Sequence, residues 1–525
     1  MPSEPIAPPS PHDSPASAST YVDTRDDTLD SAIPQRTAQE QRSWDPDLRK
    51  STRSNKSYVT EVQKALVSGE FIVKDDEMDS IDMFTIDEVD SSEARAKWLE
   101  AIDSEVQSLI DKQTWHIIKK SEMPRGRTLV NYKWVFKVKF DETDNVQKYK
   151  ARLCAKGFTQ KEGIDYTETF SPVARGTTFK LLLSLGTVEG FKYRHLDVKT
   201  AFLNGILSEQ IYMKIPKYII RYMQQHYGQY MDVRIDDVDK EYVLELHKAL
   251  YGLKQASREW NQMFDAFMIS AGFIRSRSDV CMYHKGDRDN KVIVLVYVDD
   301  IIVASKHDTL LDEFYTTMSA RFQIESDSLH YYVGMQITID EGASASINQS
   351  NYINRICKRA DVSVNKKMVT PMSAHRHDRM TRQMSPSDDD AHDQVMMTTY
   401  RSNVSSIMYA AVHSRPDVTY SANLAARFMS NPGEKHGESV TRIFQYLMNT
   451  TDKHITYTRP SDVHKRNQLV CYVDTSHADS DDLRTTVGYV IYLNDGPISW
   501  RTLLHKGHCG SPTESEYMGM YHGVS

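Results

Sequence analysis

The sequence predicts an α+β protein with more than one folded unit, on three observations. The chain has 525 residues, which is more than one ordinary domain holds. Helical and strand periodicities intermingle from about residue 92 onward. With 40% hydrophobic and 26% charged residues, the composition is typical of a globular protein, and it excludes collagen-like, membrane-embedded and wholly disordered classes.

Residues 1–91 are predicted to form a disordered acidic leader. This segment is rich in Ser, Pro, Asp and Thr and has little apolar periodicity, so it cannot offset the entropy lost on ordering. Up to about residue 110, acidic residues outnumber basic ones roughly two to one. The formal net charge of −8 is therefore unevenly distributed, and residues 131–256 lean basic, as contact with phosphate groups requires.

The cysteines and the apolar runs indicate the cellular environment. The five cysteines lie far apart and form no Cys/His cluster with metal-ligand spacing, which favours a reducing compartment. The strongest apolar run, residues 292–304, is too short to span a bilayer and contains two acids, and there is no N-terminal signal pattern. We therefore expect a protein that is neither secreted nor membrane-spanning.

Ordered structure is expected to begin near Ser92 with a helix whose apolar face carries Trp98, Ile102 and Leu109. Two strands of a hairpin follow at 132–140 and 146–154, because Lys alternates with Val and Phe in the first of them. This hairpin is expected to present a row of cations: Lys137, Lys139, Lys148, Lys150 and Arg152. The lysines either contact a nucleic-acid template or form an ordinary solvated strand face.

The rest of the chain mixes helices and strands. We expect a helix at 179–190, a strand at 193–198 and a helix at 257–271. A Tyr- and Gln-rich insertion at 216–243 is expected to loop out. After a linker, a helical block at 400–449 leads into a β-rich tail.

A pair of acids stands between two apolar, β-branched runs. Residues 292–298 and 301–304 flank Asp299 and Asp300, a pattern typical of a hairpin with carboxylates at its tip. The alternative is an ordinary hairpin turn, in which Asp is favoured for its turn geometry alone.

A third acid, Asp197, ends the strand expected at 193–198, where it could also cap the following turn. Joining a 3′-hydroxyl oxygen to an α-phosphate uses two divalent metal ions bridged by carboxylates. Mg²⁺ prefers oxygen ligands, which three converging Asp residues would supply, and Mn²⁺ is the alternative ion.

Five groups of residues match the motifs of one family in that family's order. They resemble the reverse transcriptase of copia-type LTR-retrotransposon polyproteins, and the resemblance runs from about residue 98 to residue 333. It is specific, because several independent motifs occur at compatible spacings. The matching segments are 150–153 with 156–160, 169–173, 196–205, 250–256 and 297–300.

This resemblance implies a right-hand polymerase of fingers, palm and thumb that performs RNA-directed DNA synthesis. The implied partners are an RNA template, a DNA primer, their RNA–DNA hybrid and deoxynucleoside triphosphates. Asp197, Asp299 and Asp300 would be the catalytic carboxylates that hold the two Mg²⁺ ions. Asp299 is preferred to Asp300 as a direct ligand, because adjacent residues point to opposite faces. Similar elements replicate in cytoplasmic virus-like particles before a nuclear stage, and we expect the same here.

Four residues match nucleotide-binding positions of the family. Arg152 resembles the arginine that grips the triphosphate, and Lys150 lies beside it. Phe202 occupies the place of the aromatic gate that rejects a ribose 2′-hydroxyl, although a buried core phenylalanine is the alternative. Gln255 resembles the glutamine that lines the nucleotide pocket, with Lys254 as a further candidate for phosphate contact.

Beyond residue 400 the chain resembles the connection between polymerase and RNase H, and from about residue 471 the start of a retroelement RNase H. Asp474 and Glu516 match the first two of four carboxylates that hold two metal ions in that nuclease. Glu516 has an alternative role, because Thr513 three residues earlier would form a helix capping box with it.

Residues 505–510 depart from the nuclease pattern, and its last two acids would follow Ser525. We therefore expect a truncated RNase H-like domain that is unstable alone and lacks RNase H activity. The alternative to an active polymerase is a catalytically silent retrotransposon relic that only binds nucleic acid. The expected divisions are the leader at 1–91, fingers and palm at 92–340, a thumb or connection at 341–465 and the partial RNase H-like α/β segment at 466–525.

Overall fold

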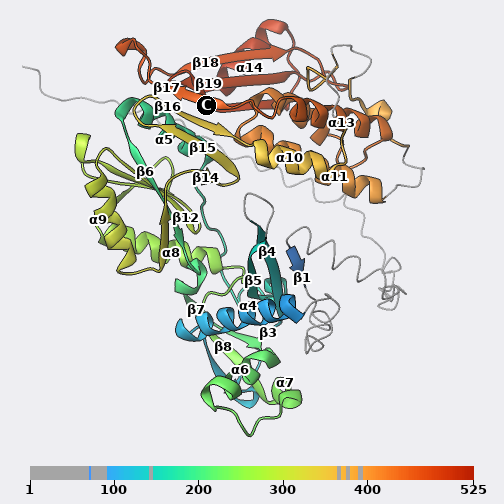
Figure 1. Ribbon diagram of the computed structural model, residues 1–525. Coiled ribbons are helices and arrows are strands. Elements are labelled where there is room, and N and C mark those ends of the chain that lie inside the picture. The colour runs from blue at the N-terminus through green and yellow to red at the C-terminus, as the bar shows by residue number, and fades with distance from the viewer. Residues whose placement is uncertain are drawn as a thin grey trace, which may run out of the picture. The chain divides into compact units, whose positions relative to one another are not determined.

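The computed structural model describes residues 70–72, 92–140, 146–363, 368–373, 379–387 and 394–524. The expected leader lies outside the described residues, except for the short strand β1 (Glu70–Ile72). The described chain forms five β-sheets with helices packed against them (Figure 1). Of the helices in these ranges, none has both the length and the apolar character that a bilayer crossing requires.

The first sheet is the predicted hairpin with β1 added at one edge. β4 (Tyr132–Phe140) pairs antiparallel with β5 (Val146–Ala155), and β1 pairs with β4. Helix α4 (Ser92–Asp111) packs beside this sheet, with the predicted apolar residues Trp98, Ile102 and Leu109 buried in the core.

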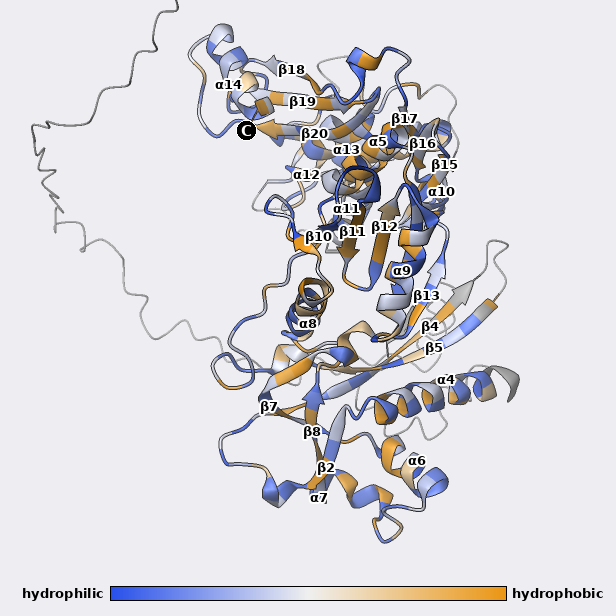
Figure 2. Cartoon of the chain, turned by 90° about the vertical axis from the view of Figure 1, so that its left-hand side faces the viewer, coloured by the Kyte–Doolittle hydropathy of each residue, from blue (hydrophilic) through white to orange (hydrophobic). Residues whose placement is uncertain are grey.

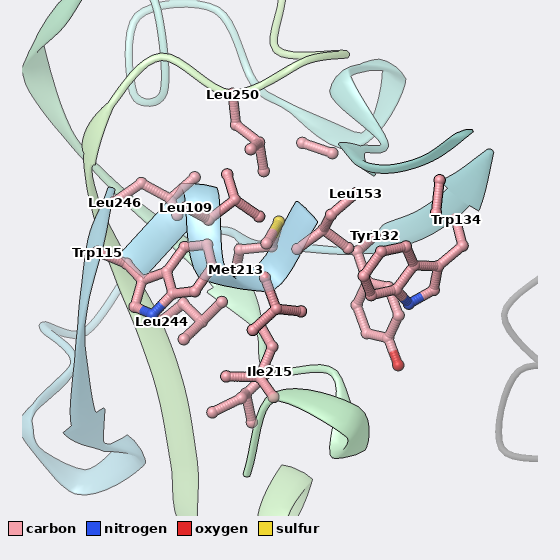
Figure 3. Close-up of a cluster of buried hydrophobic side chains, with 14 of the residues drawn as sticks. Leu109, Trp115, Tyr132, Trp134, Leu153, Met213, Ile215, Leu244, Leu246 and Leu250 are labelled. Atoms are coloured by element: carbon pink, nitrogen blue, oxygen red, sulfur yellow. The ribbon is translucent and has the colours of Figure 1, made fainter. Parts of the chain in front are cut away.

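A four-stranded sheet in the order β2-β8-β7-β3 shares the core of the hairpin. Figure 3 shows the cluster, in which Leu109 of the helix, Leu153 of the hairpin and Met213 of the sheet converge. The strands are β2 (Trp115–Lys119), β3 (Leu129–Val130), β7 (Ile206–Lys214) and β8 (Tyr242–Lys248).

The insertion that was expected to loop out is instead folded into this core, so that prediction is wrong. It forms α6 (Lys217–Tyr227) and α7 (Val238–Glu241), and Ile219 and Val238 are fully buried. In α6 the apolar side chains of Ile219, Tyr222 and Met223 recur at helical spacing. The Gln and His residues that follow at 224–226 obscure that periodicity in the sequence.

The central sheet has six strands in the order β13-β6-β12-β11-β10-β9. Because side chains alternate along a strand, the two faces of this sheet contact different helices. On one face, Leu196 and Ile301 pack on α8 (Ala256–Ser270) and α9 (Asp308–Ser319). On the other face, Ile302 packs on α5 (Gly176–Glu189). The hydrophobic colouring of β11 and β12 is visible in Figure 2. The strands are β6 (Lys192–Val198), β9 (Ile274–Arg275), β10 (Met282–Lys285), β11 (Val292–Tyr297), β12 (Asp300–Ser305) and β13 (Ile324–Asp327).

A small sheet and a helical block follow. The sheet contains β14 (Tyr331–Tyr332), β15 (Met335–Asp340), β16 (Ser344–Asn348) and, from much later in the chain, β17 (Ile455–Thr458). The helical block predicted at 400–449 consists of α11 (Gln394–His413), α12 (Thr419–Ala426) and α13 (Glu434–Asn449). The earlier helix α10 (Ser350–Arg359), which was not part of that prediction, shares one hydrophobic core with it.

The β-rich tail is a three-stranded meander with a terminal helix. It comprises β18 (Val470–Ser476), β19 (Thr486–Leu493), β20 (Gly496–Leu504) and α14 (Pro512–Val524). Leu493 and Ile498 belong to the same hydrophobic cluster as Phe179 of α5 and Ile302 of β12. The tail therefore shares part of the core of the central sheet, a packing that the sequence did not reveal.

Short 3-10 helices join several of these elements: η2 (Lys120–Glu122), η3 (Gly157–Thr159), η4 (Ala201–Asn204), η5 (Ile235–Asp237), η6 (Arg288–Asn290), η8 (Arg382–Met384), η9 (Pro416–Val418) and η10 (Val463–Lys465).

Candidate active site

Strand register brings two of the three predicted acids opposite each other, and the third lies in the adjoining turn. β12 pairs antiparallel with β6 so that Asp300 lies directly opposite Asp197. Residues opposite each other in an antiparallel pair project from the same face of the sheet. Asp299 lies in the two-residue turn between β11 and β12, and its backbone carbonyl accepts a hydrogen bond from the Val198 N–H at 3.0 Å.

The preference for Asp299 over Asp300 as a direct metal ligand stays a prediction, but the strand alternation on which it was based does not apply to this pair. Strand alternation applies only to residues within a strand, and Asp299 lies in the turn. Asp300, the first residue of β12, is the member of the pair that shares a face with Asp197.

The turn that carries Asp299 has a strained backbone. Val298 has a φ of 58°, in the left-handed region that a β-branched residue rarely adopts, at a cost of about 1–3 kcal/mol. The indole Nε1 of Trp260 donates a hydrogen bond of 2.7 Å to the Val298 carbonyl oxygen. Trp260 is 2% exposed at the start of α8, so the helix holds the turn in place. An aromatic residue on the apolar face of the predicted helix was the only sign of this contact in the sequence.

The acids influence one another electrostatically. Burial is the main cause that raises the pKa of Asp299, and the charges of Asp300 and Asp197 raise it further. The nearby guanidinium of Arg152 acts in the opposite direction. The turn therefore concentrates negative charge at a partly buried position, and a cation would relieve the repulsion.

His195 is a neighbour that sequence reasoning missed. Its Nε2 lies 3.2 Å from Oδ1 of Asp300, and it precedes Asp197 by two residues on the same face of β6. That period-two spacing was the available signal. In the arrangement that the described ranges show, no three His, Cys, Asp or Glu side chains are grouped closely enough to hold an ion.

Two of the predicted nucleotide-binding residues meet at an aromatic ring that was not singled out. Arg152 of β5 places its guanidinium carbon 4.6 Å from the centroid of the Tyr251 ring. The Phe202 ring, in η4, meets the same ring edge-on at 4.9 Å. Phe202 is only partly buried, between the core of the hairpin and that of the central sheet, so it is not an ordinary core residue.

Gln255 is placed differently from the expectation. The side chain has no exposed surface, and its Nε2 donates to the Asp165 carbonyl at 2.8 Å while its Oε1 accepts from Gln160 at 3.1 Å. It therefore stabilises a loop instead of facing an open pocket. Lys254, the further candidate for phosphate contact, donates a hydrogen bond of 2.8 Å to the Tyr166 hydroxyl.

The basic hairpin is only partly described at the level of side chains. Lys148 is exposed and Lys150 is partly exposed on β5. The side chains of Lys137 and Lys139 lie outside the described residues, although their backbones pair with Lys150 and Lys148. Template contact by these lysines stays a prediction.

The two predicted RNase H acids lie on neighbouring elements. Asp474 is on β18, and Glu516 of α14 accepts a hydrogen bond of 2.8 Å from the hydroxyl of Thr475. The alternative capping box of Thr513 with Glu516 is wrong, because the helix begins earlier than that pattern requires. Ser511 accepts instead from the backbone N–H of Glu514 at 3.2 Å.

Comparison with known proteins identifies the family. Residues 112–374, about half of the chain, match the family model described as reverse transcriptase (RNA-dependent DNA polymerase). The Pol polyprotein from transposon TNT 1-94 of Nicotiana tabacum is 34% identical over 83% of this chain and 31% of its own length. The Pol polyprotein from transposon RE2 of Arabidopsis thaliana is 32% identical over 80% of this chain and 27% of its own length.

Two further matches are more distant. A putative transposon Ty5-1 protein of Saccharomyces cerevisiae is 28% identical over 62% of this chain and 97% of its own length. A solved structure of a foamy viral protease-reverse transcriptase in complex with double-stranded DNA is 10% identical, with a TM-score of 0.43, over 82% of this chain and 60% of that chain. This chain spans less than a third of the two plant polyproteins. The chain belongs to the reverse transcriptase (RNA-dependent DNA polymerase) family and is similar to the Pol polyproteins of copia-type plant retrotransposons.

Proposed function

We propose that this chain performs RNA-directed DNA synthesis, extending a DNA primer on an RNA template with deoxynucleoside triphosphates. The observation that carries the proposal is the cross-strand register of Asp197 with Asp300, with Asp299 in the adjoining turn. Family membership supports the same reaction. Three carboxylates near the end of a central sheet are the ligand chemistry that nucleotidyl transfer needs.

Two Mg²⁺ ions, with Mn²⁺ as the alternative, are the cofactors that this proposal implies. The chemistry of the donors fits them, because all three acids offer oxygen and their mutual repulsion contributes to the raised pKa of Asp299. The described side chains would have to move closer together to hold an ion. Such ions, when bound, activate the primer 3′-hydroxyl and neutralise charge on the triphosphate. His195 would orient Asp300 through their 3.2 Å contact, while Asp197 and Asp299 complete the set.

The fingers residues would position the nucleotide. Arg152 carries a planar cation that can bind phosphate oxygens in a bidentate manner, and Lys150 adds a second positive charge on the same strand. Phe202 would lie against the sugar and exclude a 2′-hydroxyl. Gln255 would act indirectly, because its buried amide fixes the loop around Asp165.

Primer extension tests the proposal directly. The full chain is supplied with an RNA template, a DNA primer, deoxynucleotides and Mg²⁺. Asp299→Asn and Asp197→Asn should each slow extension on the order of 10²- to 10³-fold, because bound metal lowers the activation barrier by several kcal/mol. Asp308→Asn is the matched control, since this acid of α9 is largely exposed and pairs with Lys192.

The alternative, a silent relic, predicts a different pattern. Folded wild-type protein would bind the RNA–DNA hybrid yet extend no primer under any of these conditions. Hybrid binding measured in the same preparation separates that outcome from simple misfolding.

A further inference from the structure

Resting on the proposed polymerase function, we infer that Tyr251 is a positioning residue that sets both nucleotide affinity and sugar selectivity, because its single ring supports Arg152 and Phe202. The two supported residues come from separate elements, β5 and η4. Tyr251 itself lies in the segment between β8 and α8. No other described ring contacts both.

The position of Tyr251 is fixed through its backbone. Its carbonyl oxygen accepts a hydrogen bond of 2.7 Å from the N–H of Ala155, at the end of β5. The next residue, Gly252, has a φ of 88°, and a Cβ built there would lie 2.1 Å from the Ala155 carbonyl oxygen. Only glycine allows this approach without displacing the backbone. The turn is thereby held against the strand that carries Arg152.

Strand β5 is also fixed at the residue directly after Arg152. Glu105 of α4 is 8% exposed, and its carboxylate accepts a hydrogen bond of 3.1 Å from the N–H of Leu153. The backbone that directly follows Arg152 is therefore restrained at two positions: Leu153 is bonded to Glu105, and Ala155 is bonded to Tyr251. With the strand fixed, the direction of the guanidinium depends on the surface on which it rests.

That surface is the Tyr251 ring. A guanidinium that lies on an aromatic face keeps the N–H groups of its edge available for phosphate oxygens. Among the described residues Arg152 makes no ion pair, so its charge is not neutralised by a protein carboxylate in contact with it. Removing the ring would leave Arg152 free to adopt many rotamers.

The same ring supports Phe202 laterally. The two rings meet at 4.9 Å with an interplanar angle of 63°, and Phe202 is only partly buried. A gate against a 2′-hydroxyl works only if its ring cannot retreat when a ribonucleotide enters. A smaller residue at 251 would give Phe202 that room, so ribonucleotides should be accepted more readily.

Single-nucleotide insertion by the full chain tests the inference, with Tyr251→Leu, Tyr251→Phe and Tyr166→Leu compared with wild type. Tyr251→Leu should raise the KM for a deoxynucleotide about 10-fold, equivalent to about 1.4 kcal/mol, with a smaller change in kcat. It should also lower the preference for deoxynucleotides over ribonucleotides about 5- to 10-fold. Tyr251→Phe keeps the ring and should stay within about 2-fold of wild type on both measures.

Tyr166→Leu is a matched control. It removes another tyrosine that lies under a cation, Lys254, at the same 4.6 Å. This change should leave sugar selectivity unaltered. A folded Tyr251→Leu protein with wild-type KM and wild-type selectivity would overturn the inference while leaving the polymerase function intact.

Equilibrium binding of dTTP to the protein–hybrid complex covers the case in which wild type extends no primer. Binding requires no turnover, so it separates failure of the proposed function from failure of the inference. Tyr251→Leu should still weaken dTTP binding about 10-fold. Equal affinity for wild type and Tyr251→Leu would contradict the role assigned to the ring.

Discussion

Asn494 joins the C-terminal sheet to the central core, and its replacement by Ala should destabilise both. The residue is 3% exposed in the turn between β19 and β20. Its amide nitrogen donates to the carbonyl and the hydroxyl of Ser184 in α5, at 3.0 and 3.1 Å. Its oxygen accepts from the N–H of Asn467 at 2.8 Å. Asn494→Ala removes all of these bonds at once.

The expected cost has two parts. Leaving buried polar partners unsatisfied costs about 1–3 kcal/mol. Asn494 also has a φ of 49°, and Ala tolerates that left-handed conformation less well than Asn, by about 1–2 kcal/mol. We therefore expect a total loss of about 3 kcal/mol. Asn494→Gly removes the same hydrogen bonds, but glycine adopts a positive φ without strain. It should therefore lose about 1 kcal/mol less stability than Asn494→Ala.

Urea unfolding of the full chain measures this loss, followed by tryptophan fluorescence and by far-ultraviolet circular dichroism. Leu493 and Ile498 share a hydrophobic cluster with the central sheet. The midpoint of the main unfolding transition should therefore move to lower urea, and no separate transition of the C-terminal sheet should appear. A loss below about 1 kcal/mol would refute the reasoning. The reasoning would also be refuted if the variant shifted only an early unfolding transition and left the main transition unchanged.

Two further predictions concern single groups. Trp260→Phe removes the donor to the Val298 carbonyl and should slow primer extension about 10-fold without unfolding the protein, which kcat and thermal melting together would check. Burial raises the pKa of Glu105 from 4.5 to about 7. Between pH 4.5 and about 7 the native state therefore binds more protons than the unfolded state, so the free energy of unfolding falls as pH rises through this range. Glu105→Gln should therefore gain stability relative to wild type by up to about 3 kcal/mol between pH 5 and 8, and parallel pH profiles would contradict this.

The sequence predicted the elements of the site better than their arrangement. The β-branched runs on either side of Asp299 and Asp300 specify a hairpin locally, and β11 and β12 confirm it. The pairing of Asp300 with Asp197 depends on a contact between strands far apart in the chain, which only the family motifs suggested. Local patterning does not determine such long-range register.

The direction in which a side chain points was harder to predict from the sequence than the element that carries it. A motif assigns Gln255 a position, but whether its amide faces a pocket or a loop depends on partners such as Asp165 that no local pattern identifies. A similar difficulty affected Glu516, where a shift of two residues in the start of the helix moved the cap to Ser511. Helix ends are among the least certain features of a sequence.

The segment at 250–260 couples the two halves of the site. At one end, Tyr251 contacts Arg152 of the hairpin, and at the other, Trp260 holds the turn that carries Asp299. The segment also passes from one hydrophobic core to the other, since Leu253 is buried in the first and Trp260 in the second. A substitution that shifts it should therefore alter nucleotide affinity and the geometry of the acids together, although no residue within it is itself a predicted metal ligand.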